Sequence, residues 1–378
     1  MSHRILFYPV GNGDTSQIVL ENGKRILFDF RHLSSSEDGK GPEINLSERL
    51  KQELKEAERS SFDVVAFTHG DKDHIENSTD FFELRHSSKY QGSDRIKIDT
   101  LWVPAAMILE SASKEERSSE FVIWRQEARY RLKEGNGIRV FSKPERLKEW
   151  LEENDLSIES RQGLITDAGA IAPEFSFGND GVEFFCHSPF MRHVDEREEF
   201  RNEASLIFNV RFEISGNTYD YFAVGDTEYG VLEEVVAATK RHKRMDRLSW
   251  DLFSVPHHCS YKALSDEKGT TETAPVPLVK EILLQGKQGA YIVSSSEPTQ
   301  DTEEARLQEQ PPHIQARKCY ERFLEQVDGA RLLVTMEESK ASEPKPIVFQ
   351  LDRDGLTHEK PRLSAATHIT SRPAPRAG

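Results

Sequence analysis

Short apolar runs mark the start of the chain as β-structure. Residues 4–10 (RILFYPV), 15–20 (TSQIVL) and 25–30 (RILFDF) are rich in β-branched and aromatic side chains. The last two runs are joined by ENGK, residues 21–24. Asn-Gly between two such runs is the strongest short-range signal for a β-hairpin. The pattern therefore predicts strands at all three runs, the second and third joined as a hairpin.

A helical pattern follows at residues 45–60 (NLSERLKQELKEAERS). Leu46, Leu50 and Leu54 recur four residues apart among charged side chains, which predicts an amphipathic helix. The apolar segment 63–68 (DVVAFT) then predicts a buried strand. Strand, helix and apolar strand in succession are typical of a layered α/β fold.

Residues 76–165 are less regular. Residues 113–135 have a helical pattern, and 144–155 (PERLKEWLEEND) form a second helical segment with Pro near its start. We expect this region to be a mainly helical insertion that lies over the functional site.

Strand signals return in the second half of the chain, together with one helical segment at 314–326. Residues 358–378 have no apolar periodicity and are predicted to be a disordered tail, which leaves 1–357 as one domain. The predicted strands of this half are 181–189, 205–214, 219–226, 250–258, 290–296, 331–335 and 346–352.

Composition describes a soluble, heavily charged chain of 378 residues with a net charge of −15 and a mean hydropathy of −0.64. No apolar run approaches the roughly 20 residues that span a bilayer, and the first residues lack the features of a signal peptide. Three cysteines, none in a CxxC pair, fit a reducing cytosol. We therefore expect a cytoplasmic protein without membrane contact. The acidic balance argues against a protein that coats nucleic acid, although metal ions can supply positive charge locally.

The densest set of ionisable side chains follows the apolar strand 63–68 directly. His69, Asp71, Asp73 and His74 fall within the segment HGDKDH. A solvated loop would explain one histidine beside an aspartate, but four candidate ligands after a buried strand favour a metal site. Residues 69, 71 and 73 can converge on one side of a tight loop while residue 74 faces a second point. Two metal ions a few ångströms apart need such an arrangement.

The segment THGDKDH resembles the HxHxDH signature of the metallo-β-lactamase fold, with Asp71 in place of the second histidine. This variant is similar to the hydrolase domain of the DNA-uptake protein ComEC and its soluble relatives. In the opening motif Asp29 matches the family, whereas Phe30 and Arg31 depart from it. The resemblance covers roughly residues 4–350 and includes, in the family's order, VGNGDTSQIVL with ILFDF, NEASLIFNV, FAVGDTE and SVPHHCSYKA.

This resemblance implies an α/β fold, the αββα sandwich of two mixed β-sheets with external helices. It also implies a hydrolase site at one edge of the sandwich, where two divalent metal ions activate a water molecule. The implied ligands are His69 and Asp71 for one ion, Asp73, His74 and His258 for the second, and Asp226 as the bridging carboxylate.

Other histidines have more than one interpretation. The family places a histidine ligand before the NEASLIF strand, and His187 either fills that role or is a satisfied core histidine; His193 is a further candidate. Adjacent His257 and His258 should point to opposite faces because strand side chains alternate. His257 then either lines the pocket or acts on the leaving group, and we expect Asp73 to have a catalytic role as well as a ligand role.

Polar residues near these motifs are candidates for substrate binding. Ser260 and Lys262 follow the last histidine motif and could contact a substrate phosphate, while Asn202 stands just before SLIF. Cys259 replaces the family's usual glycine. It is a thiolate ligand or nucleophile, or, as we prefer, a tolerated small residue.

Substrate and metal follow from the resemblance and the ligand types. Asp71 enriches the first site in oxygen, which shifts preference from Zn²⁺ toward Mn²⁺ or Mg²⁺, so we expect Zn²⁺ or Mn²⁺. ComEC-like domains imply a phosphodiesterase or nuclease acting on nucleic acid or a nucleotide. An acidic chain would then need a local basic track, for which 240–247 and 129–133 are candidates. The alternatives are a hydrolase of a small ester, lactone or thioester, and a non-catalytic partner-binding module, which the retained ligands disfavour.

Overall fold

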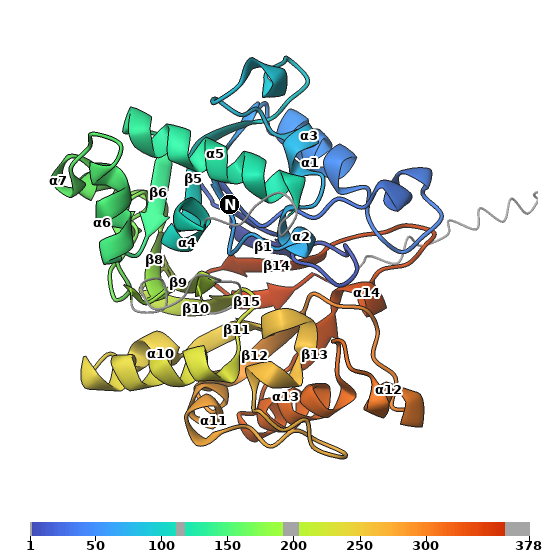
Figure 1. Cartoon of the computed structure of the whole chain (residues 1–378). Helices are drawn as coiled ribbons and strands as arrows, with labels where there is room; N and C mark the ends of the chain where they lie inside the picture. The colour runs from blue at the N-terminus through green and yellow to red at the C-terminus, as the bar shows by residue number, and fades with distance from the viewer. Residues whose placement is uncertain (1, 111–117, 192–203, 360–378) are drawn as a thin grey trace, which may run out of the picture.

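The computed structural model describes residues 2–110, 118–191 and 204–359, which form two mixed β-sheets packed face to face. The larger sheet has nine strands in the order β15-β14-β1-β2-β3-β4-β5-β6-β7, and the smaller has six in the order β13-β12-β11-β10-β9-β8. Helices cover the outer face of each sheet (Figure 1). This arrangement confirms the predicted αββα sandwich of two mixed sheets.

The larger sheet is antiparallel from β15 to β3 and parallel from β3 to β7. Strands β2 and β3 pair with Ser16 opposite Phe28, around a turn at Asn22 and Gly23, which confirms the predicted hairpin. The strands of this sheet are β1 His3–Phe7, β2 Ser16–Val19, β3 Arg25–Phe28, β4 Ser61–Ala66, β5 Lys97–Pro104, β6 Ile138–Phe141, β7 Ile165–Thr166, β14 Ile347–Asp352 and β15 Gly355–His358.

The smaller sheet begins as an antiparallel meander from β8 to β10 and continues in parallel from β10 to β13. Parallel neighbours end at the same edge of a sheet, so the loops after β10 and β11 lie side by side. Its strands are β8 Val182–Ser188, β9 Ile207–Ile214, β10 Asn217–Val224, β11 Trp250–Ser254, β12 Gly286–Ser294 and β13 Arg331–Val334.

Apolar side chains fill three layers of core. Between the sheets, Phe7, Trp102 and Phe208 are among the buried residues of both inner faces. One outer layer packs α1, α4, α5 and α6 on the larger sheet, and the other packs α10, α11 and α13 on the smaller. These helices are α1 Leu46–Glu56, α4 Ala105–Leu109, α5 Ser119–Glu134, α6 Glu145–Glu152, α10 Tyr229–Arg241, α11 Pro277–Leu283 and α13 Ile314–Gln326.

The region 76–165 contributes strands as well as helices. It holds α3 (Ser78–Phe81), α4, α5, α6 and α7 (Ile158–Arg161), but β5 and β6 run through it and extend the larger sheet. It is therefore an integral part of the sandwich rather than a mainly helical insertion. At the carboxyl end, β15 includes His358, and residues 360–378 of the predicted tail lie outside the described residues. None of the described helices is long and apolar enough to cross a membrane.

Candidate metal centre

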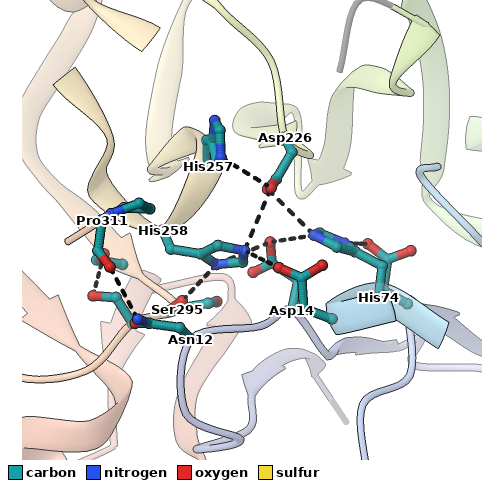
Figure 2. A network of polar contacts seen from close by, with 12 residues as sticks. Asn12, Asp14, His74, Asp226, His257, His258, Ser295 and Pro311 are labelled. Atoms are coloured by element: carbon teal, nitrogen blue, oxygen red, sulfur yellow. Dashed lines mark hydrogen bonds and ion pairs between the residues drawn. The ribbon is translucent and has the colours of Figure 1, made fainter. Parts of the chain in front are cut away.

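Four segments that follow strands bring the candidate ligands to one edge of the sandwich. Asp14 lies in the connection between β1 and β2, and His74 lies in α2 (Lys72–Ile75), just after β4. Asp226 lies two residues after the end of β10, and His258 lies in the short 3-10 turn Pro256–Cys259 that follows β11. Figure 2 shows these four side chains pointing toward one another from their separate segments.

The four residues form a compact cluster. One potential ligand atom from each of Asp14, His74, Asp226 and His258 lies within 4.8 Å of all the others. His74 Nε2 is 3.3 Å from Asp226 Oδ1, and His258 Nε2 is 3.4 Å from Asp226 Oδ2. Asp14 Oδ2 completes the group at 4.0 Å from His74 Nε2 and 3.9 Å from His258 Nδ1. Two imidazoles and two carboxylates at this spacing form a donor set that suits Zn²⁺ or Mn²⁺.

Several buried polar atoms of the centre lack a hydrogen-bond partner among the described residues. They are His69 Nε2, His74 Nε2, Asp226 Oδ1 and His257 Nδ1. Leaving a buried polar atom unpaired costs about 1–3 kcal/mol, so folded proteins rarely leave several together. His74 Nε2 and Asp226 Oδ1 lie close to each other without hydrogen-bond geometry, as two ligands of one cation would. The residues therefore fit a divalent metal ion.

Hydrogen bonds fix the orientation of the two clustered imidazoles. Asp29 Oδ2 lies 2.8 Å from His74 Nδ1, and both oxygens of this carboxylate accept from Thr68, from its backbone N–H at 2.7 Å and its hydroxyl at 2.6 Å. His258 Nδ1 lies 3.0 Å from the carbonyl oxygen of Ser295. In each ring the Nδ1 proton has an acceptor, so the neutral ring that binds a metal would keep this proton and present the Nε2 lone pair toward Asp226.

The turn that carries Asp14 is held in place from both sides. The Asn12 side chain donates to the carbonyl of Pro311 at 3.0 Å (Figure 2). It also accepts from the N–H of Glu297 at 2.8 Å, and Arg31 donates to the carbonyl of Asn12. A Cβ on Gly13 would come within 2.2 Å of Arg31 Cδ. The same Cβ would lie 2.7 Å from the backbone oxygen of Asp73, so only glycine allows this close approach and Gly13 is required for the position of Asp14.

The other residues of HGDKDH surround the cluster. Asp73 Oδ2 lies 3.0 Å from His258 Nε2, so Asp73 contacts the cluster directly. His69 is buried with its ring centroid 4.0 Å from that of His74, and its Nε2 lies 3.8 Å from Asp71 Oδ2. The structure places Asp71 beside His69, but among the described residues these two do not belong to a cluster of three or more potential ligands.

His257 and His258 lie on strained backbone. Strand β11 ends at Ser254, so the pair is not part of a strand and the expected alternation of strand side chains is wrong. His257, His258 and Cys259 all have positive φ angles, of 50°, 50° and 68°. Such runs of non-glycine residues are rare and cluster at functional sites. With this backbone, the imidazoles of His257 and His258 both lie near Asp226, and His257 Nε2 is 3.8 Å from Asp226 Oδ2.

Charges in the centre depend on one another. Burial raises the pKa of Asp14 to about 6, against the opposing effect of His258 and His74. Burial also disfavours ionisation of Asp226, but His258 and His74 outweigh it and hold its pKa well below the usual range. For His74, burial is outweighed by Asp226 and Asp29, which raise its pKa. A metal ion would displace that proton, because ligation requires the neutral imidazole.

Other predicted site residues lie elsewhere. His187 is buried between the rings of Phe185 and Phe222, and its Nε2 contacts the backbone carbonyl of Arg247 at 3.0 Å. The ring is therefore a satisfied core histidine rather than a member of the cluster. Asn202 and His193 lie outside the described residues.

Residues after His258 differ in accessibility. The Ser260 hydroxyl is buried and accepts the N–H of Lys262, so it caps a turn. The Lys262 side chain is 53% exposed and its ammonium lies 3.9 Å from Glu228, which leaves it able to meet a substrate. Cys259 is buried among apolar residues, and burial raises the pKa of its thiol to about 12, so it is a small packing residue rather than a thiolate.

The sequence did not identify Asp14 or Asp29 as functional. Asp14 stands in a glycine-rich turn and Asp29 at the end of a strand, where aspartate is ordinary. One available signal was their position in the opening motif VGNGDTSQIVL with ILFDF. The positive φ of Asp29, 54°, is visible only in the structure.

Comparison with known proteins gives similarity at the level of solved structures. No family model matches the chain, and no curated protein sequence matches it. The chain is similar to the metallo-β-lactamase GOB-18 from Elizabethkingia meningoseptica (14% identity, TM-score 0.33, covering 85% of this chain and 86% of that chain). It is also similar to the class B3 di-zinc metallo-β-lactamase LRA-12 from an Alaskan soil metagenome (11% identity, TM-score 0.33, covering 85% of this chain and 88% of that chain). A third similar structure is that of a diphosphatase from the PhnP family (12% identity, TM-score 0.29, covering 83% of this chain and 95% of that chain). Similarity this low does not assign the chain to a family, so its function is inferred from its own residues.

Proposed function

We propose that this chain is a two-metal-dependent hydrolase that cleaves phosphodiesters, with nucleic acid or a nucleotide as its substrate. The observation that carries the proposal is the cluster of Asp14, His74, Asp226 and His258, in which the buried atoms His74 Nε2 and Asp226 Oδ1 lack hydrogen-bond partners within the described chain. Such a cluster is costly to maintain unless a cation satisfies it.

The chain's residues divide between two cation positions. Asp14, His74 and His258 would hold one ion, His69 and Asp71 would hold the other, and Asp226 would contact both. When bound, two divalent cations activate water for attack and stabilise the charge on the attacking and leaving oxygens of a phosphodiester. The excess of carboxylate oxygen in this set favours activity with Mn²⁺ as well as Zn²⁺.

Two further residues have positions suited to the substrate. The His257 side chain is 21% exposed, whereas those of His74 and His258 are at most 3% exposed, so His257 is the imidazole that a substrate can reach. We assign it the role of proton donor to the leaving oxygen. Lys262, at the rim, is a point charge for a substrate phosphate.

A substrate panel tests this proposal. Protein loaded with Zn²⁺ or Mn²⁺ should hydrolyse bis(p-nitrophenyl) phosphate and then single- or double-stranded DNA. His257→Ala should lower kcat by about a hundredfold, the usual contribution of a general acid, with little change in KM. Lys262→Ala should instead raise KM. Turnover of p-nitrophenyl acetate or a lactone, with none of any phosphodiester, would favour the hydrolase of small esters instead.

A further inference from the structure

A cavity lies on the outer side of the smaller sheet. It has a volume of about 310 Å³, which falls in the range of small-molecule sites. The cavity is bounded by the edge strand β8, by residues 167–169 and by the carboxyl-terminal half of α10. Its lining includes Asp167, Phe185, Phe190, Ala238, Arg241 and Arg244.

This cavity is separate from the metal centre. Helix α10 begins at Tyr229, close to Asp226, but the helix residues that line the cavity run from Val235 to Arg241. Thr239 is roughly 15 Å along the helix from Tyr229 at a rise of about 1.5 Å per residue. None of the clustered ligands lines the cavity.

Flat groups form part of the wall. The Phe185 ring is buried, and the guanidinium group of Arg244, which also lines the cavity, lies over it at 5.5 Å. Phe190, half-buried, adds a second aromatic ring. Aromatic rings and guanidinium planes are the surfaces on which nucleobases stack.

The polar groups of the wall include both signs of charge. Asp167 Oδ1 is buried and has no hydrogen-bond partner in the described part of the chain, so it is an acceptor that lacks a donor. At the rim, the exposed Arg241 forms no ion pair with any described residue, unlike the neighbouring Lys240, which pairs with Glu281. A cation in the last turn of a helix, such as Arg241, interacts favourably with the helix dipole, but that effect does not explain the unpaired carboxylate oxygen of Asp167.

We propose that this cavity binds a nucleotide. The base would stack against the flat groups and donate an N–H to Asp167, while its phosphate would pair with Arg241. The segment KRHKRMDR (240–247) supplies this rim, so the basic segment noted in the sequence acquires a specific role. Nucleotide binding here does not depend on whether the metal centre cleaves phosphodiesters.

Calorimetric titration of the full chain with adenosine 5′-monophosphate tests the proposal. We expect binding that is at least about tenfold tighter than for ribose 5-phosphate or adenosine, because each lacks one recognised group. Arg241→Glu should weaken binding by about tenfold or more. Ala238→Phe, which fills the cavity, should abolish it, with far-UV circular dichroism confirming the fold.

Matched controls separate this cavity from the metal centre. Lys243→Glu makes the same charge change on an exposed residue that does not line the cavity, so it should leave affinity unchanged. Asp226→Asn should also leave it unchanged. Affinity that is insensitive to Arg241→Glu and Ala238→Phe, or that is lost in Asp226→Asn, would overturn the proposal.

A twelve-residue oligodeoxyadenylate distinguishes a free nucleotide from a nucleotide unit within a strand. Binding of the oligonucleotide alone, with the same loss in Arg241→Glu and Ala238→Phe, supports a strand as the source. Binding of neither ligand overturns the proposal, and hydrolysis at the metal centre would remain to be judged by its own assay.

Discussion

Asp29 orients the imidazole of His74 without being part of the ligand cluster. Its carboxylate accepts two hydrogen bonds from Thr68 and lies 2.8 Å from His74 Nδ1. Asp29→Asn keeps the size of the side chain and suits the positive φ of this position, which asparagine tolerates. The new amide N–H₂, however, would face His74 Nδ1 as a donor. The proton of His74 should therefore move to Nε2, the atom that faces Asp226.

This change of tautomer removes the lone pair that a metal ion needs. Loss of a residue that orients a metal ligand typically costs about 10–100-fold in affinity, or about 1.4–2.7 kcal/mol. We expect Asp29→Asn to weaken Zn²⁺ binding by that factor, measured by competition with a chromophoric chelator. Nitrogen-15 spectra of the histidine side chains should show the proton of His74 on Nε2.

A control variant tests whether the effect is specific. Asp63 accepts hydrogen bonds from Arg25 and Arg59 away from the centre, so Asp63→Asn should leave Zn²⁺ affinity unchanged. Wild-type affinity in Asp29→Asn, with His74 still protonated at Nδ1, would refute this account of how the ligand is oriented.

Three further predictions address the rest of the site and the fold. Gly70→Ala should reduce metal affinity, since a Cβ there would lie 2.3 Å from the Phe121 ring. In a double-mutant cycle, the effects of Gly70→Ala and Phe121→Leu on metal affinity should be coupled, and additive effects would contradict the clash. His258→Ala should lose more metal than His257→Ala in elemental analysis, whereas equal loss would mean that both ligate. Burial lowers the pKa of His187 to about 4, so its neutral form contributes up to about 3 kcal/mol of stability above pH 6.5 that is lost as pH falls toward 4. Urea unfolding of His187→Leu should show a shallower pH dependence over that range, and an unchanged slope would exclude this source.

Much of the fold was predictable because its strands and hairpin have strong local signals. The Asn22-Gly23 turn, the helix at 45–60 and the helix at 314–326 all depend on neighbouring residues, and the structure has them. Strands β5 and β6 were missed. All four residues of β6 are buried, so the alternation that marks a half-exposed strand is absent.

The site was predictable only in part, for a similar reason. His69 to His74 stand out because four candidate ligands fall in one short segment. Asp14 approaches His258 only through packing of the two sheets, which no local pattern contains. His187 has the right place along the chain for a ligand, but its ring faces two phenylalanines and a backbone carbonyl instead of the centre.

Metal content of the purified protein tests the central claim most directly. Protein prepared without chelator and measured by inductively coupled plasma mass spectrometry should hold about two Zn²⁺ or Mn²⁺ ions per chain, as a two-metal hydrolase does. Asp226→Asn should lose most of both ions while its circular dichroism spectrum is unchanged, because in the proposed site Asp226 would contact both positions. A wild-type content below about half an ion, not restored by added Zn²⁺ or Mn²⁺, would contradict a metal centre built from Asp14, His74, Asp226 and His258.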